Sequence, residues 1–240
     1  MADMERPLER RASVRTAVVW EACRSRLDLA PGQTVLDIGG GTGELAVRIA
    51  ELGHRVTVID PSPDALAALG RRAADRGVAG RVEAQQGDIA SLADLVPDGS
   101  VDLVLCHEVL GLVTDPAAAL GSIARTLRPG GALSVVVSQR HAAVLARAMG
   151  GHFVQAKELL DADPAGERRF TADELRDLLA AGGFSVSALQ AVRVFTGLVP
   201  STLLDIEPGA VAGLLELERA VAGRPEYLAL AAQVHAIAVI

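Results

Sequence analysis

An apolar segment that runs into an acid and then into a cluster of glycines constrains the fold more than any other part of this sequence. Residues 35–38 are apolar except for Asp37, four glycines lie within residues 39–43, and residues 44–50 have the apolar spacing of a helix. Glycine lets the backbone turn at positive φ and approach a ligand closely, because no Cβ intervenes. A strand, a glycine turn and a helix in this order predict the first unit of a nucleotide-binding α/β sheet.

The alternation of strand-like and helix-like segments continues along the chain. The pattern predicts strands at 35–38, 55–60, 82–88, 101–107 and 132–138, and helices at 44–51, 61–76 and 116–127. Ser62 is the expected N-cap of the second of these helices, and residues 128–131 (Arg-Pro-Gly-Gly) read as a sharp turn. Acidic or polar residues stand at the carboxyl ends of the strands, which is where such sheets bind their ligands.

The flanking segments complete the predicted domain, which spans residues 1–240. Residues 1–30 form an N-terminal helical extension with a helix at 13–29, residues 33–139 form the cofactor-binding core, and residues 140–240 supply substrate-side elements and closing strands. In this last part the pattern predicts helices at 142–149 and 171–181, an irregular lid-like segment at 150–169, a strand at 184–195, a helical insert at 202–230 and a strand at 234–240. The fold class is therefore α/β and Rossmann-like, with a seven-stranded, mostly parallel sheet, helices on both faces and a helical insert before the last strand.

Charge and cysteine content limit the possible partners. The formal net charge is -7, which argues against broad nonspecific nucleic-acid binding because that needs a basic surface. Cys23 and Cys106 are far apart in the sequence, so we expect free thiols and a reducing compartment. Neither a signal peptide nor a bilayer-spanning segment is found, so we expect a cytoplasmic protein with no membrane partner. We also expect no metal ion.

The spacing of acids and glycines narrows the identity of the ligand. An acid-x-G-x-G-x-G pattern begins at Asp37, which differs from the G-x-G-x-x-G of dinucleotide folds, and no P-loop lysine follows it. Asp60 ends the second strand and Asp88 follows the third. With the Arg-Pro-Gly-Gly turn, these features resemble the class I S-adenosylmethionine-dependent methyltransferases over residues 33–139.

This resemblance implies S-adenosyl-L-methionine as the cofactor. Asp37 and the glycine backbone would face its methionine end, Asp60 would accept both ribose hydroxyls, and Asp88 would accept from the adenine amino group beside the Ile89 N–H. The alternatives are that Asp60 only opens a helix and that Asp88 is only a helix cap.

A second resemblance covers most of the chain. Residues 14–20, 106–110, 192–195, 214–218 and 226–228, with His235, are similar to the bacterial tRNA 5-carboxymethoxyuridine methyltransferase family, which methylates the carboxylate of a modified wobble uridine. It implies that Arg15 binds the cofactor carboxylate, that His107 lies beside the cofactor, and that Arg193 and Tyr227 hold a substrate carboxylate, while His235 is structural. The implied catalytic residues are His107, Arg193 and Tyr227. The implied cofactor-binding residues are Arg15, Asp37, Gly39, Gly40, Gly41, Asp60, Asp88, Ile89 and His107.

The acceptor stays open between two classes. Residues 155–163 are acidic where the family carries lysines, and Glu108 and Gly111 depart from its pattern. We expect an O-methyltransferase of a carboxylate, acting on tRNA or on a small metabolite, as a monomer or homodimer. A carboxylate needs no general base because it is already ionised at neutral pH, whereas a hydroxyl, phenol or amine would need one, and His107 or Glu108 would be the candidates. A cofactor-binding module without catalysis and a dehydrogenase are further alternatives, disfavoured by the intact loop and acids and by the glycine spacing.

Overall fold

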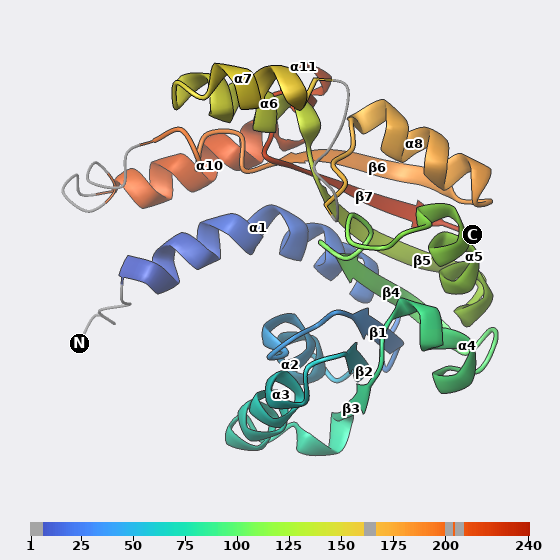
Figure 1. The fold of residues 1–240 in the computed structure, drawn as a ribbon. Helices are drawn as coiled ribbons and strands as arrows, with labels where there is room; N and C mark the ends of the chain where they lie inside the picture. Colours follow the sequence, from blue (N-terminus) through green and yellow to red (C-terminus); the bar gives the residue numbers. More distant parts are fainter. Residues whose placement is uncertain (1–6, 161–166, 200–203, 205–208) are drawn as a thin grey trace.

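The computed structural model describes residues 7–160, 167–199, 204 and 209–240, and for residues 7–15 it describes the helix but not the side chains. A seven-stranded sheet forms its centre, in the order β3-β2-β1-β4-β5-β7-β6 (Figure 1). The strands are β1 (Thr34–Ile38), β2 (Arg55–Asp60), β3 (Val82–Gln86), β4 (Val101–His107), β5 (Leu127–Ser138), β6 (Ser185–Val192) and β7 (Gln233–Val239). β7 runs antiparallel to both of its neighbours, and the other pairs are parallel. The predicted seven-stranded, mostly parallel sheet is confirmed.

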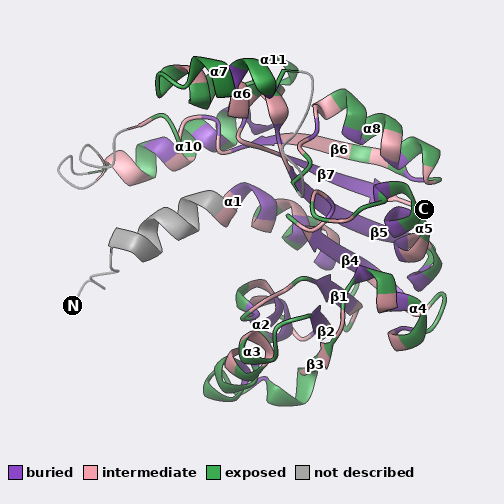
Figure 2. Ribbon diagram, viewed as in Figure 1, coloured by how far each residue is buried: buried purple, intermediate pink, exposed green. Residues whose placement is uncertain are grey.

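Helices cover both faces of this sheet (Figure 1). They are α1 (Pro7–Leu27), α2 (Glu44–Glu51), α3 (Pro63–Asp75), η1 (Ala79–Arg81), η2 (Ile89–Ser91), α4 (Leu92–Leu95), α5 (Pro116–Thr126), α6 (Arg140–Met149), α7 (Phe153–Glu158), α8 (Ala172–Ala181), α10 (Ala210–Ala222) and α11 (Pro225–Leu228). One core cluster joins the sheet to α4, α5 and α8, and another joins it to α1, α2, α3 and α10. Successive β1 residues alternate between the two clusters, with Leu36 and Ile38 in the first and Val35 in the second. Both faces are therefore buried, as Figure 2 shows, which is why the central strands read as nearly continuous apolar runs.

Capping groups begin the helices where the sequence places them. The Ser62 hydroxyl accepts from the Ala65 N–H at 3.2 Å, and Thr171 forms a reciprocal capping box with Glu174.

α10 and α11 lie between β6 and β7, as predicted for the helical insert, although residues 200–203 and 205–208 of that insert lie outside the described part of the chain. Both cysteines are buried and free. No helix among the described residues combines the length and apolarity needed to cross a membrane.

Three local predictions are wrong. Residues 128–131 are not a turn that precedes the strand but an irregular stretch inside β5, where Gly130 has φ 79°. The Gly130 N–H donates to the Ile240 carbonyl, and the Ile240 N–H donates to the Gly131 carbonyl. The segment 150–169 is not wholly irregular, since it contains α7, and its residues 161–166 lie outside the described part. β6 ends at Val192 rather than at 195, because the chain turns at Arg193 with φ 61°.

Candidate active site

A cavity of about 860 Å³ lies at the carboxyl ends of the strands on both sides of β1. The predicted cofactor-binding residues that line it are Gly39, Asp60, Asp88, Ile89 and His107. Its other wall is the segment that follows β4 and runs into α5, which is largely apolar. A mainly apolar cavity of this volume, with a few carboxylates in its lining, suits a nucleoside-sized ligand.

The carboxylate of Asp60 fixes the glycine loop against the end of β2. Its Oδ2 accepts from the Gly41 N–H at 2.9 Å, and its Oδ1 accepts from the Ser62 N–H at 2.9 Å. Gly41 has φ 55°, a conformation that glycine adopts without strain. A carboxylate can accept about four hydrogen bonds, so Asp60 both opens the following helix and keeps lone pairs for hydroxyl donors in the cavity.

Asp37 is a buried acid at the end of β1 that lies outside the cavity lining. Its residue is 4% exposed, and no hydrogen bond or ion pair to its carboxylate is found among the side chains described. Burial, followed by the negative charge of Asp60, raises the pKa of Asp37 to about 7. Gly40 lies directly against this carboxylate, since a Cβ at Gly40 would be 2.5 Å from Asp37 Oδ2. A cation placed beside Asp37 would therefore be strongly stabilised.

Asp88 caps the short helix η2 with one of its two carboxylate oxygens. Oδ1 accepts from the N–H groups of Ala90 and Ser91 at 3.0 and 3.1 Å, and the Ser91 hydroxyl contacts the Asp88 backbone N–H in return. Asp88 and Ile89 also line the cavity. Asp88 is therefore a helix cap through its Oδ1, as the alternative interpretation expected. Its Oδ2 makes no hydrogen bond within the described residues.

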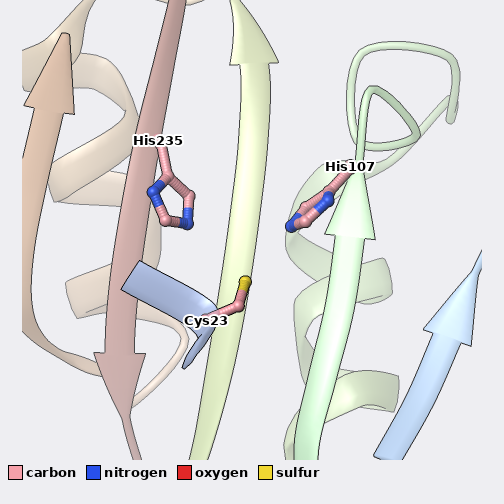
Figure 3. A group of neighbouring side chains, drawn as sticks. All are labelled: Cys23, His107 and His235. Carbon is pink, nitrogen blue, oxygen red and sulfur yellow. The ribbon is translucent and has the colours of Figure 1, made fainter. Parts of the chain in front are cut away.

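His107 ends β4 and borders the cavity, and one of its ring nitrogens is held by a buried hydroxyl. Its Nε2 lies 2.8 Å from Ser134 Oγ, which is also 2.9 Å from His235 Nε2 and 3.3 Å from Cys23 Sγ. Figure 3 shows how Cys23, His107 and His235 lie relative to one another. Burial lowers the pKa of His107 to about 4, and burial together with His107 lowers the pKa of His235 to about 3. Both imidazoles are therefore neutral at neutral pH.

Two residues with unusual backbone conformations mark the other half of this edge. Glu108 (φ 58°) and Arg193 (φ 61°) are the described non-glycine residues with positive φ, a strained conformation that often accompanies function. Glu108 Oε2 accepts from the Ser138 hydroxyl at 2.8 Å, and its Oε1 accepts from Gln233 Nε2 at 2.9 Å. Glu108 lines the cavity, whereas Arg193 and Tyr227 do not.

The turn that carries Arg193 is anchored by an acid whose role the sequence analysis missed. Glu218 is 1% exposed, and its carboxylate accepts from the backbone N–H groups of residues 194, 195 and 196 at 2.8–2.9 Å and from the Thr196 hydroxyl at 2.6 Å. Tyr227 packs edge-on against Phe195, with ring centroids 6.0 Å apart. The sequence could have indicated this role, because Glu218 lies on the apolar face of α10, where a buried acid needs hydrogen-bond partners.

The structure brings most of the predicted site to one edge of the sheet. Of the cofactor candidates, Asp37 and Asp60 lie at the carboxyl ends of β1 and β2, and Asp88 follows β3. Glu108 and Arg193 follow β4 and β6. Arg15 lies in α1, but its side chain is outside the described part of the chain.

Comparisons with known proteins identify relatives that match either nearly the whole chain or about half of it. A methyltransferase domain family matches residues 36–135. The tRNA 5-carboxymethoxyuridine methyltransferase of Escherichia coli K12 is 29% identical over 95% of this chain and 88% of its own. A ubiquinone biosynthesis O-methyltransferase of Xanthomonas oryzae pv. oryzae is 40% identical, over 53% of this chain and 52% of its own. Among solved structures, an S-adenosylmethionine-dependent methyltransferase from Mesorhizobium loti matches with a TM-score of 0.63 and 21% identity, covering 95% of this chain and all of that one (100%).

Proposed function

Because the chain is a class I S-adenosylmethionine-dependent methyltransferase, we propose that it methylates an oxygen of a carboxylate-bearing acceptor, with 5-carboxymethoxyuridine in tRNA as the first candidate. One observation carries this proposal. The similarity to the Escherichia coli tRNA enzyme covers 95% of the chain and so extends well beyond residues 36–135, into β6, α10, α11 and β7. The similarity to the ubiquinone enzyme covers only 53% of the chain.

The residues at the edge of the sheet fit this cofactor. A buried carboxylate with no cation among the described side chains beside it, Asp37, suits the ammonium group of the cofactor. Asp60 keeps lone pairs for the ribose hydroxyls, and the open oxygen of Asp88 suits the adenine amino group. When bound, the cofactor supplies an electrophilic methyl group.

The acceptor in this proposal lies along the carboxyl ends of β4, β5 and β6 and the start of β7. Arg193 and Tyr227 hold its carboxylate, because a guanidinium pairs with a carboxylate through two parallel hydrogen bonds. Glu218 supports this role by fixing the turn that follows Arg193. A carboxylate is ionised at neutral pH, so the protein needs to align it and exclude water rather than remove a proton.

The test is methyl transfer from labelled cofactor to tRNA from a strain that lacks this modification enzyme. We expect label in tRNA, and nucleoside mass spectrometry should find a methyl ester on the wobble uridine. Arg193→Ala should lower kcat/KM about 10- to 100-fold, whereas Arg176→Ala, which removes an exposed arginine of α8, should not. Binding of the cofactor without any labelling of tRNA would refute the tRNA acceptor.

A second candidate, a small-molecule hydroxyl or phenol, is favoured by Glu108. Its carboxylate is held at the cavity by Ser138 and Gln233, where it would repel an acceptor carboxylate but could take a proton from a hydroxyl. Glu108→Gln separates the two candidates. It should lower the activity on a hydroxyl acceptor about 100-fold or more, and it should preserve or raise the activity on a carboxylate because a like charge is removed.

A further inference from the structure

A line of hydrogen-bonded side chains crosses four adjacent strands beneath the acceptor half of the edge. Gln190 on β6, His235 on β7, Ser134 on β5 and His107 on β4 are joined in that order by contacts of 3.0, 2.9 and 2.8 Å. Cys23 on α1 adds the Sγ contact to Ser134. Figure 3 shows both rings and the thiol around a common centre. His235, Ser134 and Cys23 are 0% exposed, so the line meets the cavity only at His107.

The protons along this line can be assigned from one end to the other. Gln190 Oε1 can only accept, so His235 carries its proton on Nδ1, and its Nε2 presents a lone pair. The Ser134 hydroxyl must then donate to His235 Nε2, which leaves its oxygen to accept from His107 Nε2–H. The Cys23 thiol donates to the same oxygen, and burial, the largest influence on this group, raises the pKa of Cys23 to about 11. Every contact in the line then has one donor and one acceptor, and no group in it carries a charge.

One lone pair is left over, on Nδ1 of His107. No hydrogen bond to this atom is found within the described residues, it is not among their buried polar atoms without a partner, and His107 lines the cavity. We propose that Ser134 and His235 are positioning residues that fix the tautomer of His107, so that the active-site wall presents a hydrogen-bond acceptor at Nδ1.

This assignment determines which chemical groups can bind next to His107. A neutral ring that offers a lone pair, next to the carboxylate of Glu108, attracts an N–H or O–H donor and rejects an anion. A carboxylate-bearing acceptor must therefore point its carboxylate away from His107, toward Arg193, and turn a donor edge toward β4. This specificity rests on the proposed function, whereas the tautomer of His107 does not.

The same atoms could also be read as a metal site, since Cys23, His107 and His235 offer ligand atoms within 4.8 Å of one another. Thiolate and imidazole are donors that zinc prefers. The Ser134 hydroxyl, however, is within hydrogen-bond distance of one atom of each residue, namely Cys23 Sγ, His107 Nε2 and His235 Nε2, so these atoms already have a partner without a metal ion. The structure therefore favours a hydrogen-bonded cluster, and a metal ion is an outcome that the test can reveal.

Nitrogen NMR of ¹⁵N-histidine-labelled protein at neutral pH tests the inference without any acceptor. We expect opposite tautomers, with the proton on Nε2 of His107 and on Nδ1 of His235, with signals assigned from His107→Gln and His235→Gln. A proton on Nδ1 of His107 would overturn the proposal. In Ser134→Ala, His107 should become a mixture of tautomers, whereas Cys106→Ser, which alters the other buried thiol, should leave both rings unchanged. A His107 tautomer that stays unchanged in Ser134→Ala would also overturn it.

Metal analysis after incubation with zinc completes the experiment. We expect no stoichiometric zinc. One equivalent that is retained by wild type and by Cys106→Ser but lost in Cys23→Ser would overturn the hydrogen-bonded assignment in favour of a metal site. If the tautomers are as stated while tRNA is not labelled, the proposed acceptor fails and the assignment of His107 stands.

Discussion

Replacing Asp37 by asparagine should make the protein less sensitive to pH. The pKa of Asp37 is about 7 in the folded chain, raised mainly by burial, against 3.8 for an exposed aspartate. Below pH ~4 both states are protonated, and Asp37 contributes no pH dependence. Between pH ~4 and ~7 the unfolded chain releases the proton and the folded chain keeps it, so the free energy of unfolding falls as the pH rises. A pKa difference of about 3 corresponds to a loss of up to ~4 kcal/mol, which persists above pH 7.

Asp37→Asn removes the ionisable group and therefore this loss. The difference in unfolding free energy between the variant and wild type should rise from about pH 4 to about pH 7 and then level off. Urea denaturation followed by circular dichroism measures it, and a constant offset from the new amide would not change the slope. Asp75→Asn, which alters an exposed acid at the end of α3, is the matched control and should show no such rise. A pH-independent difference for Asp37→Asn would refute the reasoning.

The cofactor should stabilise wild type more than the variant, whereas without cofactor the charge of Asp37 destabilises wild type. If Asp37 pairs with the ammonium group, S-adenosylhomocysteine should stabilise wild type more than Asp37→Asn, and calorimetry should show affinity lower by about 10- to 100-fold in the variant. Equal affinities would remove Asp37 from the cofactor site while leaving the pH argument intact.

Two further substitutions test the geometry of the site. A Cβ at Gly40 would lie 2.5 Å from Asp37 Oδ2, so Gly40→Ala should cost about 1–3 kcal/mol in urea denaturation and weaken cofactor binding. Gly70→Ala, where a Cβ meets nothing within 4 Å, should instead stabilise α3 by ~0.5–1 kcal/mol, and equal effects would contradict the close approach. Glu218→Gln should cost about 2–3 kcal/mol because an amide N–H₂ would face a buried N–H. The exposed neighbour Glu216→Gln should change little, and a similar loss there would argue against the buried anchor.

The meeting of the three candidate cofactor acids at one edge of the sheet was predictable because it depends on local geometry. Asp37, Asp60 and Asp88 each end or closely follow a parallel strand, and parallel strands bring their carboxyl ends to one edge whatever the connections between them. The apolar runs also show where each central strand lies in the sequence, because both faces of the sheet are buried. The glycine spacing then restricted the ligand.

The missed features depend on partners far away in the sequence. Residues 128–131 look like a turn because proline and glycine favour turns, but pairing with Ile240 at the end of the chain overrides that preference. Ser134 sits in an apolar strand and has no local signal, since its partners come from α1, β4 and β7. Glu218 likewise acts on a turn that follows β6.

The same contrast explains why the methyl donor is easier to infer than the acceptor. The acceptor half joins the ends of β4, β5 and β6 to the start of the antiparallel β7, so its charges come from segments without a shared motif. Two charged residues of the described part of this edge, the carboxylate Glu108 and the guanidinium Arg193, have positive φ, and the proposed function gives each a role toward the acceptor. A carboxylate acceptor would need the positive charge of Arg193. A hydroxyl acceptor would instead need the carboxylate of Glu108, acting as a general base, to take its proton. The relative loss of activity in Glu108→Gln and Arg193→Ala therefore distinguishes the acceptor classes more directly than overall similarity to any relative.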